Sequence, residues 1–274
     1  MRTKTLLIAA AALAVGVASS LAQTTYSQNV VGYVNTTIPA GAYQILGNQL
    51  VNGSDANATN GDINTCLVNG FVSDPAGPPS GHNSVYFQWT GGGYNNFYYF
   101  TAADATTWEG FASPAGWYDL LGNYAAVDQT TAQGAFILNA SGSAMTVTIT
   151  GNVLQGTNSS TINTGYNLMT LMAPVSTNLT AAGIGLPANL TSDPTGPPSG
   201  NNDVWFQWTG GGYNNYYWFN AADATTWEGA ASPAGWYDIL GNPAPAAANP
   251  GVNQGFFLLH HGAAIPWTTT FTVQ

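Results

Sequence analysis

The most constraining feature of this sequence is a long internal repeat. Residues 74–123 recur at 193–242 with a constant offset of 119, and nine of the 50 positions differ. Weaker matches continue on both sides, and they pair QGAFIL (133–138) with QGFFLL (254–259) and TTIPAGAYQI (36–45) with STINTGYNLM (160–169). Each repeat has the size of one β-sandwich domain, so we expect two similar folded units.

The composition of the repeats indicates an all-β fold. Short runs rich in Val, Tyr, Phe, Trp and Thr are separated by Gly, Pro and Asn, and no stretch keeps a helical period. We expect two tandem β-sandwich-like domains from an internal duplication, at residues 23–150 and 151–274. Residues 1–22 precede them and differ in composition.

The clearest predicted element is a hairpin at residues 84–100, with the sequence SVYFQWT, GGG, YNNFYYF. Glycine tolerates the positive φ that a two-residue hairpin turn requires. A turn at residues 91–92 places Trp89 opposite Tyr94. The same hairpin recurs in the second repeat.

Side chains alternate along the two strands, so the hairpin has two faces. One face carries six residues that are identical in both repeats, and in the first repeat they are Val85, Phe87, Trp89, Tyr94, Tyr98 and Phe100. The other face carries aromatic residues that differ between repeats: Tyr86, Phe97 and Tyr99 in the first, and Trp205, Tyr216 and Trp218 in the second. A packed core resists changes of shape more than an open surface does. We therefore expect the first face in the core and the second as an aromatic platform for a ligand or another unit.

The N-terminus has the pattern of an export signal. Arg2 and Lys4 precede an apolar run from Leu6 to Ala18, and small residues precede a cleavage site after Ala22. The apolar run is too short to span a bilayer. We expect residues 1–22 to be a signal peptide, and the protein to be secreted, extracellular or at the cell surface, without membrane insertion after cleavage.

Charge and cysteine content exclude several classes of function. Arg2 and Lys4 are the only Lys and Arg residues, so the chain without its signal has twelve acidic residues and neither basic type. Such a chain cannot neutralise phosphates, which excludes nucleic acid and acidic lipid as partners. Because Cys66 is the only cysteine, we expect neither an intrachain disulfide nor a zinc–thiolate site.

The acidic residues largely repeat with the sequence around them. Eight of the twelve form four pairs of equivalent positions: Asp74 and Asp193, Asp104 and Asp223, Glu109 and Glu228, Asp119 and Asp238. Such carboxylates stabilise turns, bind calcium together with loop oxygens, or serve a glycoside hydrolase as acid and base. We favour turns, and we assign no catalytic residue. The calcium candidates are Asp104, Glu109, Asp223 and Glu228.

Three stretches carry a resemblance: SQNVVGYVNTTIPAG (27–41), the hairpin with Trp108 and Trp117 downstream, and QGFFLL followed by a threonine-rich strand. They resemble a group of secreted, β-rich, duplicated-domain bacterial proteins without an assigned activity. The resemblance implies a secreted β fold and supplies no functional residues. The depletion of Lys and Arg departs from the usual pattern of that group.

Two non-enzymatic functions follow from these features. The first is a structural or assembly protein of the cell surface, extracellular matrix or a filament. Its subunits would join head to tail when the segment from Tyr26 to Val34 pairs with the C-terminal strand of another copy. The alternative is a carbohydrate-binding protein with one aromatic platform per repeat, because rings stack on sugar faces. A secreted glycoside hydrolase is the least favoured interpretation.

Overall fold

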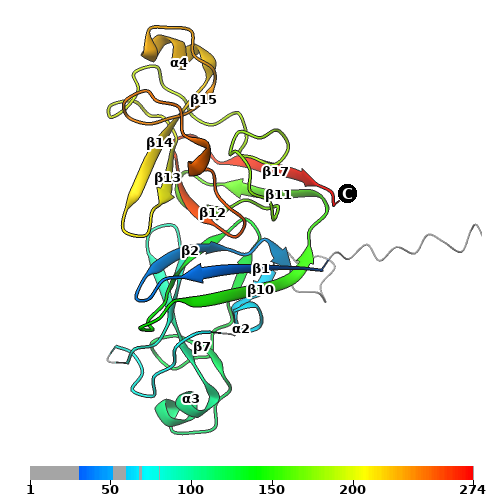
Figure 1. Cartoon of the computed structure of the whole chain (residues 1–274), viewed down its shortest axis with the longest axis vertical. Helices are drawn as coiled ribbons and strands as arrows, with labels where there is room; N and C mark the ends of the chain where they lie inside the picture. Colours follow the sequence, from blue (N-terminus) through cyan, green and yellow to red (C-terminus); the bar gives the residue numbers. More distant parts are fainter. Residues whose placement is uncertain (1–30, 52–59, 68–69, 80, 274) are drawn as a thin grey trace, which may run out of the picture. The chain divides into compact units, whose positions relative to one another are not determined.

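The structure, a computed structural model, describes residues 31–51, 60–67, 70–79 and 81–273. The expected signal peptide at residues 1–22 lies outside this part of the chain. The described residues belong to one compact unit, built mainly from antiparallel strands, so the expected all-β class is confirmed (Figure 1). Within the described residues, no helix has the length and apolar character needed to cross a membrane.

The described part of the first repeat contains ten strands and two helices. They are β1 (Val31–Ile38), β2 (Tyr43–Gly47), β3 (Leu50–Val51), β4 (Asn60–Asp62), α2 (Ile63–Cys66), β5 (Val85–Trp89), β6 (Tyr94–Phe100), α3 (Ala102–Glu109), β7 (Gly116–Tyr118), β8 (Asp128–Thr130), β9 (Gly134–Leu138) and β10 (Met145–Val153). The last strand extends beyond residue 150, where the sequence places the boundary between the repeats.

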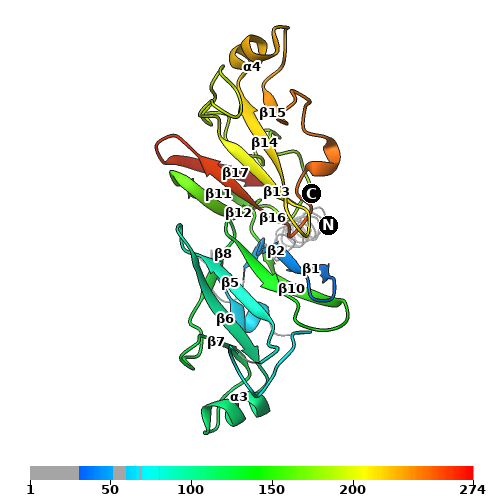
Figure 2. The same cartoon turned by 90° about the vertical axis from the view of Figure 1, so that its left-hand side faces the viewer.

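The second repeat follows the same order of main elements. They are β11 (Gly156–Ile162), β12 (Gly165–Thr170), β13 (Val204–Trp208), β14 (Tyr213–Phe219), α4 (Ala221–Glu228), β15 (Gly235–Tyr237), the 3-10 helix η1 (Ala246–Ala248), β16 (Gly255–His260) and β17 (Ile265–Phe271). Each repeat has a five-stranded antiparallel sheet, with order β2-β9-β5-β6-β7 in the first and β12-β16-β13-β14-β15 in the second (Figure 2).

The central hairpin has the expected register in both repeats. Trp89 lies opposite Tyr94, and Trp208 lies opposite Tyr213. The backbone N–H of Thr90 donates to the carbonyl of Gly93 at 2.9 Å, so the glycines form the turn between β5 and β6. The predicted turn and pairing are therefore confirmed.

A second layer covers one face of each five-stranded sheet. In the first repeat this layer is β1 paired with β10, and in the second it is β11 paired with β17. Ile38, Val147 and Ile149 from the first layer share a buried core with Tyr86 and Trp117 of the sheet. The corresponding layer of the second repeat contributes Ile162 and Trp267 to a core of the same design.

The residues expected on an exposed aromatic platform are buried in these two cores. Tyr86, Phe97 and Tyr99 lie in the first core, and Trp205, Tyr216 and Trp218 lie in the second. None of the six is more than 9% exposed. The expectation of a platform on this face is wrong, because the second layer of strands covers it.

The buried aromatic residues differ between the repeats because each core is packed differently, and not because these residues are exposed. Val147 pairs with Thr36 in the first repeat, and Trp267 takes the corresponding place opposite Ser160 in the second. Both side chains are completely buried. Cores tolerate several simultaneous apolar substitutions when the pattern and total volume are kept, so differences between copies do not identify a surface.

A buried polar pair distinguishes the second core from the first. The Asp203 carboxylate lies 2.6 Å from Nδ1 of His260, whose Nε2 lies 2.8 Å from the carbonyl oxygen of Ala263. Both ring nitrogens therefore face oxygen acceptors. The first repeat has Ser84 and Asn139 at the equivalent positions, and both are buried there too.

Replacing His260 alone is therefore expected to remove the nearer ion-pair partner of the buried Asp203 carboxylate. Unfolding by urea should show that His260→Asn lowers the free energy of unfolding by about 3–5 kcal/mol. The double variant Asp203→Ser with His260→Asn reproduces the pair of the first repeat and should recover most of that loss. Equal destabilisation by the single and the double variants would contradict this account.

Candidate functional site at the junction of the repeats

The two repeats meet through a band of aromatic side chains. Its ten members, which we call the aromatic band, are Tyr43, Phe87, Trp89, Tyr94, Phe136, Tyr166, Phe206, Trp208, Tyr213 and Phe257. Phe136 and Phe257 are buried at its centre together with Ile45 and Leu168. Phe87, Trp89 and their counterparts belong to the face expected in the interior of each repeat, and they pack between the repeats instead.

The contacts across the junction are reciprocal. The Trp89 ring packs edge-on against Phe257 with 5.3 Å between ring centroids, and Trp208 packs in the same way against Phe136 at 5.3 Å. Nε1 of Trp89 donates to the carbonyl of Tyr166 at 3.0 Å. A reciprocal arrangement of this kind is the mark of an isologous interface, in which the same surface of each partner is used.

Trp208 of the second repeat makes the equivalent hydrogen bond to the first repeat. Nε1 of Trp208 donates to the carbonyl of Tyr43, also at 3.0 Å. Backbone bridges reinforce the junction, since Leu46 pairs with Gln254 and Gln133 pairs with Met169. These bonds fix both indole rings and hold β2 and β9 next to β12 and β16.

An open cavity of about 360 Å³ lies in the aromatic band. Six rings line it, and they belong to Tyr43, Phe87, Tyr94, Phe136, Trp208 and Tyr213. Burial raises the pKa of Tyr94, and burial together with the neighbouring Tyr94 raises the pKa of Tyr213 to about 12. The hydroxyl groups of both tyrosines are therefore neutral hydrogen-bond donors across the ordinary range of pH.

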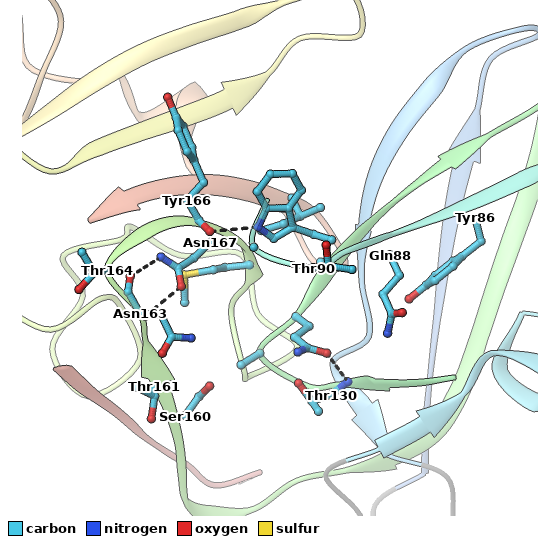
Figure 3. Close-up of a pocket in the computed structure, with 17 residues that line it drawn as sticks. Tyr86, Gln88, Thr90, Thr130, Ser160, Thr161, Asn163, Thr164, Tyr166 and Asn167 are labelled. Carbon is cyan, nitrogen blue, oxygen red and sulfur yellow. Dashed lines mark hydrogen bonds between the residues drawn. The ribbon is translucent and has the colours of Figure 1, made fainter. Parts of the chain in front are cut away.

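A second cavity, of about 350 Å³, lies beside Trp89 and Tyr166; we call it the junction groove. Figure 3 shows Gln88 and Thr130 of the first repeat on one side, and Ser160 and Asn163 of the second repeat on the other. All seventeen lining residues are uncharged. The groove therefore offers hydroxyl and amide groups beside aromatic rings, without a fixed charge.

Hydrogen bonds hold part of the junction groove in place. Nδ2 of Asn167 donates to the carbonyl of Asn163 at 2.7 Å, and Oδ1 of Asn167 accepts from the backbone N–H of Asn163 at 2.9 Å. Thr164 donates its hydroxyl to the carbonyl of Gly262 at 2.7 Å. These contacts fix the loop between β11 and β12, from which the Asn163 side chain lines the groove.

A sequence difference distinguishes the junction groove from the opposite side of the junction. Asn253 occupies that side, where its Nδ2 donates to the Thr36 hydroxyl at 3.1 Å and its backbone N–H donates to Oε1 of Gln49 at 2.8 Å. In the first repeat Ala132 stands at the position of Asn253, and Ser160 stands at the position of Thr36. The short Ala132 side chain leaves the groove open.

The acidic residues singled out from the sequence lie away from the junction groove. Asp104 accepts hydrogen bonds from the hydroxyls of Ser73 and Thr101 at the start of α3, and Asp223 does the same at the start of α4 through Ser192 and the Asn220 amide. Asp74, Asp119 and their equivalents accept backbone N–H bonds in turns.

The calcium candidates do not converge. Within the described residues, Asp104, Glu109, Asp223 and Glu228 belong to no group of three or more side chains that could hold a metal ion. Asp104 and Asp223 lie in the first turns of α3 and α4, where the hydrogen bonds described above hold them. The helix dipole stabilises a carboxylate at this end of a helix. The geometry therefore gives Asp104 and Asp223 a role at the starts of α3 and α4.

Comparison of the whole chain with protein-family models, with curated proteins and with solved structures finds no match. The junction and its two cavities must therefore be interpreted from their own chemistry. Sequence reasoning missed the junction groove, because its walls come from different repeats. The one available signal was the replacement of Asn253 by Ala132 within otherwise similar QGAFIL and QGFFLL segments.

Loss of a ring at the centre of the junction should destabilise the whole described unit. We expect Phe257→Ala to lower the free energy of unfolding by about 3–5 kcal/mol, because it removes ring contacts to Trp89 and leaves a cavity. The matched control is Phe111→Ala, whose ring is 64% exposed and should contribute within about 0.5 kcal/mol. Similar urea midpoints for Phe257→Ala and the unmodified protein would contradict the assigned role of the junction.

Proposed function

We propose that this chain is a non-enzymatic extracellular protein that binds an uncharged carbohydrate in the junction groove. The observation that carries the proposal is the lining of the groove, where hydroxyl and amide side chains lie beside the Trp89 indole and none of the lining residues is charged. Sites for small ligands combine an apolar wall with a few polar groups that set orientation. The volume of about 350 Å³ is within the range for such sites.

The chemistry of a sugar matches these two kinds of surface. A pyranose presents C–H groups on its faces and hydroxyl groups around its rim. Aromatic rings at the wall contact the faces, while amides such as Gln88 and Asn163 both donate to and accept from hydroxyl groups. An amide is suited to neighbouring hydroxyls because it carries a donor and an acceptor side by side.

Binding rather than cleavage is proposed because of what lines the groove. A glycoside hydrolase of the usual kind places two carboxyl groups on either side of the bond that it breaks. The described lining contains no Asp or Glu. The repeated aspartates accept hydrogen bonds in turns and at helix starts instead, as Asp104 and Asp119 do in the first repeat.

The proposal is tested by introducing asparagine at Ala132, because Asn253 occupies the equivalent position on the other side of the junction. We expect Ala132→Asn to lower affinity for any neutral glycan by about tenfold or more, because the added amide takes up space and competes for Ser160. Affinity is measured by calorimetry with a glycan first selected on an array. The control Gln207→Ala removes the equivalent of Gln88 in the second repeat, outside the groove, and should leave affinity unchanged.

Two results count against the proposal. One is an array on which no uncharged glycan binds to the folded protein. The other is a glycan whose affinity survives both Ala132→Asn and Gln88→Ala, since it would then occupy a different surface.

Assembly through strand edges is the second candidate function, and one observation favours it. β1 is the edge strand of its sheet, and its Val31 and Tyr33 side chains are about three-quarters exposed. The strands named in the head-to-tail hypothesis already pair within the chain, β1 with β10 and β17 with β11. Assembly would therefore use the outer edge of β1, beside which no other described strand lies and which can accept another strand.

Charged side chains on this edge should prevent such assembly. If β1 joins copies of the chain, the double variant Val31→Lys with Tyr33→Lys should sediment as a monomer while the unmodified protein forms larger species, because lysine blocks edge pairing. Analytical ultracentrifugation over a range of concentrations measures this. A monomeric unmodified protein at the highest concentration would rule out the assembly function.

A further inference from the structure

Each five-stranded sheet has an unpaired strand edge at the same place. β7 joins β6 only at Tyr98–Phe100, and β15 joins β14 only at Tyr217–Phe219. Within the described residues, no strand lies beside residues 94–97 or 213–216 on that side. Their outward backbone N–H and C=O groups are a ready template for another strand.

A tight turn causes this early end of β7. The Asp119 carboxylate accepts hydrogen bonds from the backbone N–H groups of Leu121 and Asn123 at 2.8 and 2.9 Å. Gly122 has a φ of +87°, which favours glycine. The turn sends the chain back along β7, so residues 94–97 of β6, which precede the paired residues, have no neighbour in β7. Asp238 and Gly241 form the same turn after β15.

A groove follows each unpaired edge, and we call the two the edge grooves. The first has a volume of about 450 Å³ and is lined by residues 94–98 and 119–121. The second has a volume of about 570 Å³ and is lined by residues 213–217, Asp238, Ile239, Asn242, Pro243 and Pro245, with Leu240 next to Ile239 in the same turn. Leu121 at the turn of the first is 85% exposed, and Leu240 at the turn of the second is 82% exposed.

The apolar character of these turns is kept in both repeats despite exposure. Leu120 and Leu121 correspond to Ile239 and Leu240, so one position changes shape yet remains aliphatic. By contrast, the exposed Phe111 of the first repeat is replaced by Ala230 in the second, so exposure alone does not preserve an apolar side chain. An exposed aliphatic pair beside an open backbone edge in both repeats is the combination used by proteins that bind an extended segment as an added strand.

The charges beside each groove indicate the kind of segment that fits. Gly122 packs so closely to the Glu109 carboxylate that any side chain there would collide with it, so Glu109 and Asp119 lie at the same turn. The ion pairs among the described residues involve only Asp203 with His260 and His261. Asp119 thus lines the first groove and Asp238 the second, while Glu109 and Glu228 lie against the glycines of the same turns, and none of these four carboxylates has a cationic partner among the described residues.

We propose that each edge groove binds an extended segment of a partner polypeptide that alternates apolar and basic residues. The backbone of the segment pairs with residues 94–97 or 213–216, its apolar side chains contact the exposed aliphatic pair, and its Lys or Arg side chains meet the two carboxylates. The chain supplies no such segment after its signal, because Arg2 and Lys4 are its only Lys and Arg. Two grooves in one chain make it bivalent, so it can link two partner segments.

The test uses a short fluorescent peptide of alternating Lys and Val at physiological salt, with binding followed by anisotropy. We expect two peptides per chain. A peptide of the same charge with N-methyl groups on alternate backbone amides should bind about tenfold or more weakly, because it cannot complete the strand. A peptide of alternating Glu and Val should not bind.

Single-site variants then locate the binding. Leu121→Ser and Leu240→Ser should each reduce the stoichiometry to one peptide per chain, and the double variant should abolish binding. Phe111→Ser is the control for loss of an exposed apolar residue and should keep both sites. Equal binding of the N-methylated peptide, or two sites remaining in the double variant, would overturn the proposal.

Discussion

The reciprocal packing of Trp89 and Trp208 across the junction is the constraint on which the rest of the described structure depends. Each indole packs on a buried phenylalanine of the other repeat and donates to a backbone carbonyl there. Aromatic pairs in this edge-on geometry add to the free energy of area burial. Because both rings are fixed, the strands beside them are fixed as well, and the junction groove keeps its two walls.

This constraint also explains which residues are identical between the repeats. Trp89 packs on Phe257 of the second repeat, and Tyr94 lies close enough to its counterpart Tyr213 to raise the pKa of that residue, so a change in one repeat requires a matching change in the other. Residues of an internal core, such as Tyr86, need to fit only the core of their own repeat and can change with it, as Trp205 shows. Identity between copies therefore marked the contact between repeats at Trp89, whereas Tyr98 and Phe100 are also identical and pack inside their own repeat.

Much of the backbone was predictable from the sequence, whereas the candidate site was not. Alternating aromatic residues around three glycines specified the hairpin and its pairing of Trp89 with Tyr94, because both depend on local geometry. Alternation defines two faces but does not say which of them a distant strand covers. The layer that covers Tyr86 comes from β1 and β10, far away in sequence, and the groove depends on Ala132 facing Ser160 of the other repeat.

The covalent link between the repeats has one further consequence for the junction. In a homodimer of identical subunits, an isologous interface presents the same chemistry on both sides of its axis. Tethering at a high effective concentration keeps the interface formed while allowing each half to diverge. A single chain can thus have the larger Asn253 on one side of the junction and the small Ala132 on the other. Symmetric association of identical subunits does not permit this asymmetry.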